Sequence, residues 1–143
     1  MSYLQLEGIG KRFGDFTALE DVTLGVSKGS IHALLGENGA GKTTLMNILY
    51  GFYQPDTGVI RLDGRELSID SPRQALSEGI GMIHQHFMLV DNLSVLENVI
   101  LGLPGRLRLK LADHRRKLIE LSAQVGLDVA PDRLIWQLPI GMH

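Results

Sequence analysis

Residues 36–43, Gly-Glu-Asn-Gly-Ala-Gly-Lys-Thr, have the types and the spacing that bind a chain of phosphates. A bound polyphosphate needs several backbone N–H groups turned toward it, and Gly39 and Gly41 permit the tight turns and the close approach that this requires. The ammonium of Lys42 would contact the β- and γ-phosphates, and the hydroxyl of Thr43 would bind Mg²⁺. The segment therefore predicts a phosphate-binding loop.

The residues on either side predict the strand and the helix between which such a loop lies. Residues 31–35 are nearly all apolar, which predicts a short strand buried on both faces of a parallel sheet. Leu45, Ile48 and Leu49 recur at helical spacing, and Gly51 is placed to end that helix. A simple glycine turn would not need these flanks. The residues predicted to bind the nucleotide here are Gly36, Glu37, Asn38, Gly39, Ala40, Gly41, Lys42, Thr43 and Thr44.

Alternating apolar residues predict β-strands in the remainder of the first half. Residues 3–9 and 22–26 alternate and form one predicted antiparallel pair, and residues 59–62 run into Asp63-Gly64, which favours a tight hairpin. Residues 80–83 predict a further buried strand.

Helix starts can be placed by capping residues. Ser71-Pro72-Arg73-Gln74 and Ser94-Val95-Leu96-Glu97 both have a hydroxyl at the cap and Gln or Glu three residues later. From about residue 94 onward the pattern is mainly helical, and Leu118, Leu121 and Val125 mark an amphipathic helix closed by Gly126.

Composition excludes several classes of protein. With 143 residues, 44% of them hydrophobic and 21% charged, the chain has room for one ordinary soluble domain. A net charge of −2 provides no positive field for nucleic acid, and no aromatic residues interleave with the basic residues of 106–117, so we expect no nucleic-acid partner. Cysteine is absent, which excludes thiol chemistry, and no apolar run approaches the roughly 18 residues of a membrane span.

Two other groups of residues could bind a metal but favour a different interpretation. His84 and His86 would share one face of an extended strand, yet no third ligand lies near them in the sequence, so we interpret them as ordinary polar histidines. Asp91 ends an apolar run, but Asn92 and a capped helix follow it, which indicates a loop.

Further motifs resemble the ATP-binding subunit of ABC transporters along the whole chain. In that family an aromatic residue upstream of the loop stacks on the adenine, and Phe13 occupies the matching place, with Phe16 as the alternative. Gln85 matches the glutamine that meets Mg²⁺ and the attacking water, although a solvated loop residue is the alternative. The resemblance implies ATP and Mg²⁺ as ligands, Lys42 and Gln85 as catalytic residues, and Thr43 and Gln85 as metal ligands.

Residues 138–142 resemble the signature sequence of the family, usually Leu-Ser-Gly-Gly-Gln, at two positions. Leu138 and Gly141 match, but Pro139 replaces the serine whose hydroxyl would contact the γ-phosphate held by a second ATPase domain. Whether a composite site with Pro139 is catalytic stays open. This signature and the loop sequence together resemble the tandem ATPases of bacterial simple-sugar and nucleoside importers.

The resemblance implies the fold class, an α/β P-loop NTPase of the ABC type with an incomplete core. We expect residues 1–93 to form part of the ATP-binding core with an antiparallel β subdomain, and residues 94–143 to begin a helical subdomain that contacts membrane-spanning partners.

Three catalytic elements of the family are not convincingly present. They are the Asp that binds Mg²⁺ at the end of a strand, the Glu that acts as general base and the His that senses the γ-phosphate. In the family they follow the signature, and this chain ends at His143. We therefore expect an N-terminal fragment, inactive alone, of a full-length ATPase.

The resemblance also implies a function and a set of partners. It implies ATP hydrolysis that powers import of a sugar or a nucleoside at the cytoplasmic face of the cell membrane. The implied partners are permease subunits, a second ATPase domain and, indirectly, a solute-binding protein. The alternatives are a nucleotide-binding module that does not hydrolyse ATP and an ABC protein without a role in transport.

Overall fold

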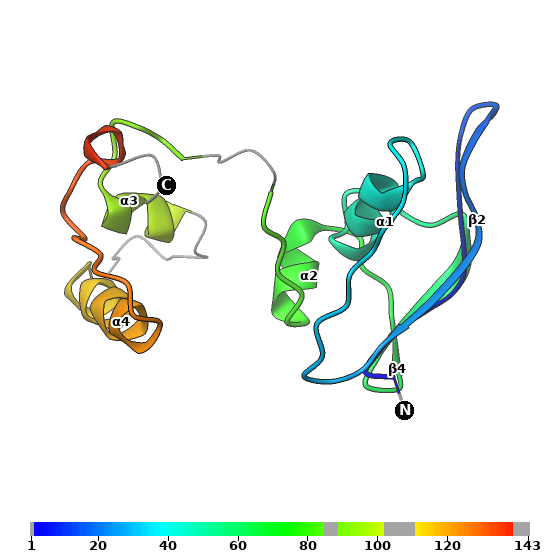
Figure 1. The fold of residues 1–143 in the computed structure, drawn as a ribbon, viewed down its shortest axis with the longest axis horizontal. Helices are drawn as coiled ribbons and strands as arrows, with labels where there is room; N and C mark the ends of the chain where they lie inside the picture. Colours follow the sequence, from blue (N-terminus) through cyan, green and yellow to red (C-terminus); the bar gives the residue numbers. More distant parts are fainter. Residues whose placement is uncertain (1, 85–88, 102–110, 139–143) are drawn as a thin grey trace. The chain divides into compact units, whose positions relative to one another are not determined.

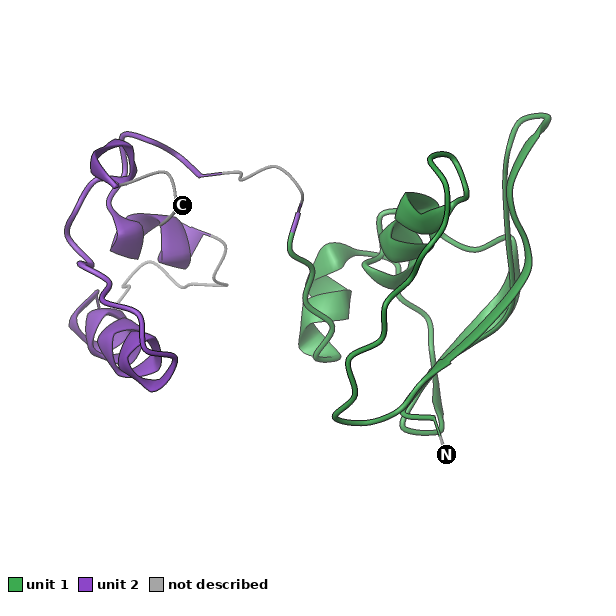
Figure 2. Cartoon of the chain, viewed as in Figure 1, with its two compact units in different colours: residues 1–83 green, residues 84–143 purple. Residues whose placement is uncertain are grey.

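The computed structural model describes residues 2–84, 89–101 and 111–138. The chain forms two compact units, residues 1–83 and residues 84–143 (Figure 2). The two domains expected from the sequence, 1–93 and 94–143, remain a prediction.

The first unit is built on an antiparallel sheet with the strand order β2-β1-β3-β4. Its two edge strands, β2 and β4, are labelled in Figure 1. The strands are β1 (Leu4–Phe13), β2 (Phe16–Val26), β3 (Thr57–Leu62) and β4 (Arg65–Leu67). Both predicted antiparallel pairs are confirmed, and β3 joins β4 through Asp63 and Gly64, whose φ angles are 51° and 78°. Such positive φ angles at both central residues are typical of the tight turn predicted there.

One face of this sheet carries the core, and the other is polar. Helix α1 (Lys42–Leu49) begins directly after the glycine-rich loop, as predicted, and its apolar face is buried with residues of β1, β2 and β3. The buried cluster consists of Leu6, Ile9, Leu19, Leu45, Ile48, Leu49 and Ile60. Because side chains alternate along a strand, this arrangement sends the intervening polar residues to the opposite face.

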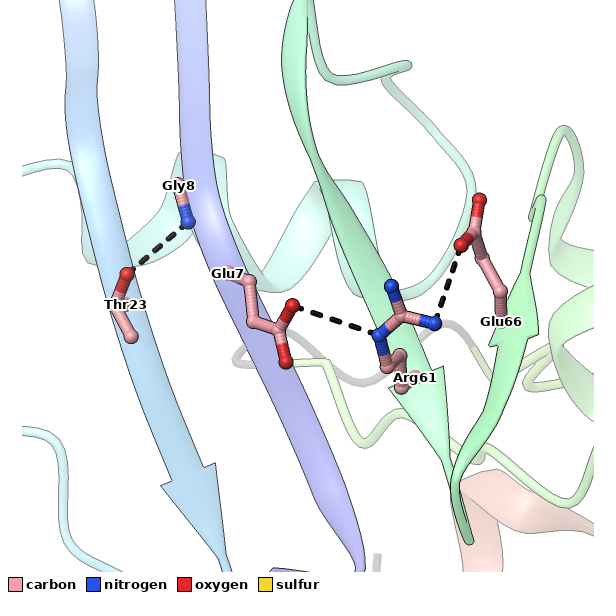
Figure 3. Close-up of polar contacts among 5 residues, drawn as sticks. All are labelled: Glu7, Gly8, Thr23, Arg61 and Glu66. Carbon is pink, nitrogen blue, oxygen red and sulfur yellow. Dashed lines mark hydrogen bonds and ion pairs between the residues drawn. The ribbon is translucent and has the colours of Figure 1, made fainter.

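Ionic contacts cross the strands on the polar side (Figure 3). The guanidinium of Arg61 on β3 lies 3.5 Å from the Glu7 carboxylate on β1 and 3.2 Å from the Glu66 carboxylate on β4. The backbone N–H of Gly8 donates to the Thr23 hydroxyl on β2 at 3.1 Å. These contacts fix the register of neighbouring strands.

Helix α2 (Pro72–Ser77) begins at the predicted cap, where the Ser71 hydroxyl accepts from the Gln74 N–H at 3.4 Å. The reciprocal bond differs from the prediction, because the Gln74 side chain accepts from the Asp70 N–H at 3.1 Å. Ala75 of α2 is buried with Leu67 and Ile69, in a second small cluster beside the sheet.

The second unit contains α3 (Val95–Leu101), α4 (Leu111–Gln124) and the 3₁₀ helix η1 (Ile135–Gln137). The capping box predicted for α3 is confirmed: the Ser94 N–H donates to the Glu97 carboxylate at 2.7 Å, and the Glu97 N–H donates to the Ser94 hydroxyl at 3.2 Å. The bond from the Ser94 N–H, followed by that from its hydroxyl, holds the pKa of Glu97 below its usual value. Helix α4 is confirmed, although it ends at Gln124, one residue before Val125, and both Leu121 and Val125 are exposed.

The two buried strands predicted at 31–35 and 80–83 are wrong. Neither segment has regular secondary structure, and Ile31, Leu35 and Ile83 are exposed. A parallel strand needs hydrogen-bonded neighbours on its edges. Among the described residues every strand pairing is antiparallel and involves β1 to β4, so neither segment has a strand to pair with.

We predict that Ile48→Ala destabilises the first unit strongly, because Ile48 has no exposed surface and lies between α1 and the sheet. Its truncation should lower the free energy of unfolding by about 2–5 kcal/mol, measured by urea denaturation. Leu76→Ala on α2 is the control, since Leu76 is 56% exposed and its loss should cost about 1 kcal/mol or less. Equal losses for the two variants would contradict this description of the core.

Candidate nucleotide-binding site

The glycine-rich loop ends at the first residue of α1. Gly41 is the N-cap of the helix, and its carbonyl accepts the first helical hydrogen bond, from the Leu45 N–H at 2.9 Å. Within the loop the Ala40 N–H donates to the Glu37 carbonyl at 3.2 Å, which closes a turn. The loop therefore reverses direction just before the helix, as a phosphate-binding loop must.

Gly41 lies too close to β2 for any side chain. Its φ is 82°, and a Cβ placed there would lie 2.7 Å from the Ala18 carbonyl oxygen and 2.6 Å from the Leu19 Cδ2 atom. Only glycine adopts this left-handed conformation without strain and also leaves this gap. The requirement for glycine at this position thus fixes the start of α1 against the hairpin of β1 and β2.

Lys42 folds back over the loop that precedes it. Its ammonium donates to the carbonyls of Gly36 and Glu37, each at 2.7 Å. An ammonium has three N–H donors, so these two bonds leave one for an anion. The positive charge is thereby held at the loop by the backbone of the loop itself.

The first turn of α1 adds groups suited to an anion and its counterion. No acidic residue lies in this turn, so no carboxylate opposes the partial positive charge of the helix N-terminus. Thr43 is exposed and Thr44 is half-buried. The Thr43 hydroxyl is therefore accessible to a metal ion, whose ligands would be oxygens.

Phe13 is the last residue of β1 and lies opposite Phe16 across the hairpin. It is 42% exposed, and its ring contacts that of Tyr53 with 5.1 Å between centroids and an angle of 74° between the planes. The Lys11 ammonium lies over the Phe13 ring, 5.6 Å from the centroid. The ring is thus at the surface and held by two neighbours.

Sequence reasoning missed Asp56, which organises this end of β1. Its carboxylate accepts from the Lys11 ammonium at 2.8 Å and from the Arg12 N–H at 2.7 Å. The bond from Lys11, followed by that from the Arg12 N–H, holds the pKa of Asp56 below its usual value. Pro55-Asp56-Thr57-Gly58 has the composition of a turn, and no signal in the sequence pairs Asp56 with residues more than 40 positions earlier.

Other predicted site residues lie outside the described residues, namely Gln85, His86, Pro139 and Gly141. His84 is described, and within the described ranges no three His, Asp or Glu side chains form a group that could hold a metal ion. The structure thus brings together the loop residues 36–44 and leaves the contribution of Gln85 as a prediction.

The second unit has an apolar pocket of about 250 Å³ that is partly open to solvent. Val95 and Val99 of α3 line it, together with Val129, Ile135 and Leu138. Among the described residues of the lining, Asn98 has the one polar side chain, and its amide donates to the Val90 and Ser94 carbonyls at 3.1 and 3.0 Å. The pocket thus offers an apolar surface rather than a polar catalytic site.

A protein-family model described as "ABC transporter" matches residues 19–143. The chain belongs to the ABC transporter family. Two relatives illustrate its position there. It is 51% identical over 142 residues to the nucleoside import ATP-binding protein NupA of Lactococcus lactis and 40% identical over 171 aligned positions to the glucose import ATP-binding protein TsgD13 of Haloferax volcanii. These alignments cover 98% and 99% of the chain but 28% and 31% of the relatives, so the chain spans less than a third of their length.

Solved structures confirm the fold class. The chain matches a nucleotide-free ATP-binding cassette from an ABC transporter with a TM-score of 0.77 at 29% identity, over 99% of this chain and 61% of that one. It also matches the ADP conformation of MJ1267, an ATP-binding cassette of an ABC transporter, with a TM-score of 0.76 at 29% identity, over 99% of this chain and 60% of that one. The fold is thus part of an ABC-type ATPase cassette. Among the described residues of this chain, no helix is long and apolar enough to cross a membrane.

We predict that Gly39 and Gly41 of the loop differ in their tolerance of alanine. Gly41→Ala should lower the free energy of unfolding by about 2–4 kcal/mol, because the left-handed backbone is strained and the new Cβ meets β2. Gly39→Ala is the matched control: its φ is 87°, but a Cβ there meets nothing within 4 Å, so only about 1–2 kcal/mol should be lost. Urea denaturation measures both values, and the prediction fails if Gly39→Ala costs as much as Gly41→Ala.

We also predict that the contribution of Asp56 to stability depends on pH. Because its pKa is lower in the folded protein than in the unfolded chain, the ionised carboxylate stabilises the fold above about pH 4, and this contribution is lost as the pH falls through the folded-state pKa. Thermal unfolding should give a higher midpoint for wild type than for Asp56→Asn at pH 6, and the two midpoints should converge in acid. Lys11→Met, which removes the same ion pair, should reduce the pH dependence as well. A gap between the midpoints of wild type and Asp56→Asn that does not narrow at all as the pH is lowered from 6 would contradict this assignment.

Proposed function

We propose that residues 36–44 bind the triphosphate of ATP and that the whole protein hydrolyses ATP to power import of a solute. The observation that carries this proposal is the loop itself, in which Lys42 is held at the backbone of a turn that leads into a helix N-terminus. Helix N-termini and converging N–H groups bind phosphate in this arrangement.

Each residue of the site has a role in this proposal. Lys42 would direct its remaining N–H donor at a phosphate oxygen while the Gly36 and Glu37 carbonyls hold its ammonium in place, and loop N–H groups would donate to the same chain of phosphates. Phe13 would stack on the adenine. Bound Mg²⁺ would neutralise charge on the β- and γ-phosphates, and the exposed Thr43 hydroxyl and Gln85 are its proposed protein ligands.

The direction of transport and the class of cargo are inferred from the relatives. NupA is named for nucleoside import, TsgD13 for glucose import, and a further relative, from Agrobacterium fabrum and 43% identical, for putative import of ribose, galactose or methyl galactoside. We therefore favour a sugar or a nucleoside as the cargo.

The proposed partners follow from this role. An ATPase that drives import must act on membrane-spanning permease subunits at the cytoplasmic face of the membrane, with a second ATPase domain and, indirectly, a solute-binding protein. We assign permease contacts to residues 94–143, the proposed start of the helical subdomain, where Val99, Leu101 and Trp136 are exposed. Exposed apolar side chains of this size favour a protein interface.

A second candidate is a module that binds ATP without hydrolysing it. Pro139 favours this alternative, because proline cannot supply the hydroxyl that serine would direct at the γ-phosphate of a partner domain. ATP turnover by the whole protein separates the two candidates.

We predict that Lys42→Ala in the whole protein weakens ATP binding about 10- to 100-fold, the loss expected for charge-assisted hydrogen bonds of roughly 1.5–3 kcal/mol. Isothermal titration with ATP measures the affinity, and turnover should fall with it. Lys117→Ala is the matched control, since Lys117 is an exposed lysine of α4 with no proposed role at the site. Unchanged affinity and turnover in Lys42→Ala would remove the assignment of this loop.

A further inference from the structure

The segment 53–57 holds the end of β1 just before Phe13. Asp56 makes three bonds to it: its N–H donates to the Gly10 carbonyl at 2.8 Å, and its carboxylate accepts from the Lys11 ammonium and the Arg12 N–H. Three consecutive residues of the strand are thus fixed by a single residue. The next residue along the strand is Phe13.

The same segment also holds the Phe13 ring. Tyr53 contacts it in an edge-to-face arrangement, which aromatic rings prefer to a face-to-face pair. The Lys11 ammonium over the ring is itself tied to Asp56, so one face of Phe13 is occupied by a tethered cation. Both rings remain partly accessible, with 42% of Phe13 and 39% of Tyr53 exposed.

The sheet register connects this ring to the phosphate loop. Lys11 pairs with Leu19 of β2, and the Leu19 side chain and the Ala18 carbonyl together leave no room for a Cβ on Gly41. Phe13 lies two residues beyond Lys11, about 7 Å along an extended strand. Phe13 therefore belongs to the same short piece of hairpin against which Gly41, the N-cap of α1, packs.

We propose that Tyr53 and Asp56 are positioning residues for the nucleobase, which fix the Phe13 ring so that a purine stacks on it. This inference rests on the proposed function, since it requires ATP at the loop. Neither residue contacts the phosphates in this proposal. Their effect is therefore confined to the base, which separates them from Lys42.

The test compares ATP with inorganic tripolyphosphate, which has the phosphates but no base, by calorimetric titration of the whole protein. Phe13→Ala should weaken ATP binding roughly 5- to 100-fold, the range typical of base–aromatic stacking, and leave tripolyphosphate unchanged. Tyr53→Ala and Asp56→Asn should each weaken ATP binding about 3- to 10-fold, again with the affinity for tripolyphosphate unchanged. Unchanged tripolyphosphate affinity also shows that the loop remains folded in each variant.

Two further variants separate positioning from general damage. Tyr53→Phe keeps the ring and should restore ATP affinity to within about twofold of wild type. Phe52→Ala removes a neighbouring exposed aromatic residue that contacts Tyr50 instead, and it should leave both affinities unchanged. Lys42→Ala should weaken the binding of both ligands, which is the result expected when the loop itself is impaired.

The outcomes distinguish this inference from the proposed function. If Tyr53→Ala and Asp56→Asn lower the affinities for ATP and tripolyphosphate equally, or lower neither affinity, the positioning role is wrong while the loop assignment stands. If Phe13→Ala leaves ATP affinity unchanged, the ring is not the stacking platform and the inference fails for that reason. If wild type binds neither ligand, or Lys42→Ala binds both as wild type does, the proposed function itself fails.

Discussion

The close packing of Gly41 against β2 is the constraint on which the site depends. Helix α1 buries Leu45, Ile48 and Leu49 against the sheet, and this contact sets the direction of its axis. The missing side chain at Gly41 then lets the first turn of the helix reach the backbone at Ala18. Burial of apolar surface stabilises the contact between the helix and the sheet, and the absence of a side chain at Gly41 allows the close approach that fixes the position of the loop.

The hairpin of β1 and β2 can serve as both a core element and a site element because its register is irregular. The pairing of the two strands shifts three times, between Leu6 and Ile9, between Ile9 and Lys11, and between Lys11 and Arg12. Bulges of this kind increase strand twist and redirect side chains. Residues before the bulges, such as Leu6, lie in the core, whereas Phe13 beyond them reaches the surface.

Local chemistry was predictable from the sequence, and long-range pairing was not. The start of α1, the Asp63-Gly64 hairpin and the capping box of α3 each depend on residues within a few positions of one another, and all three are confirmed. The strand predicted at 31–35 failed because burial of an apolar run requires neighbouring strands, which local pattern does not supply. Asp56 was missed for the same reason, since its partners lie more than 40 residues away.

The electrostatics of the site are local rather than global. A chain with a net charge of −2 cannot attract a triphosphate over long distances, so affinity must arise from groups held at the loop. The Gly36 and Glu37 carbonyls already hold the Lys42 ammonium in place, which reduces the side-chain entropy that a phosphate would otherwise have to fix on binding. A lysine free in solvent would carry the same charge with less preorganisation. Thus two backbone carbonyls, which offer no attraction to an anion themselves, contribute to anion binding through the cation that they position.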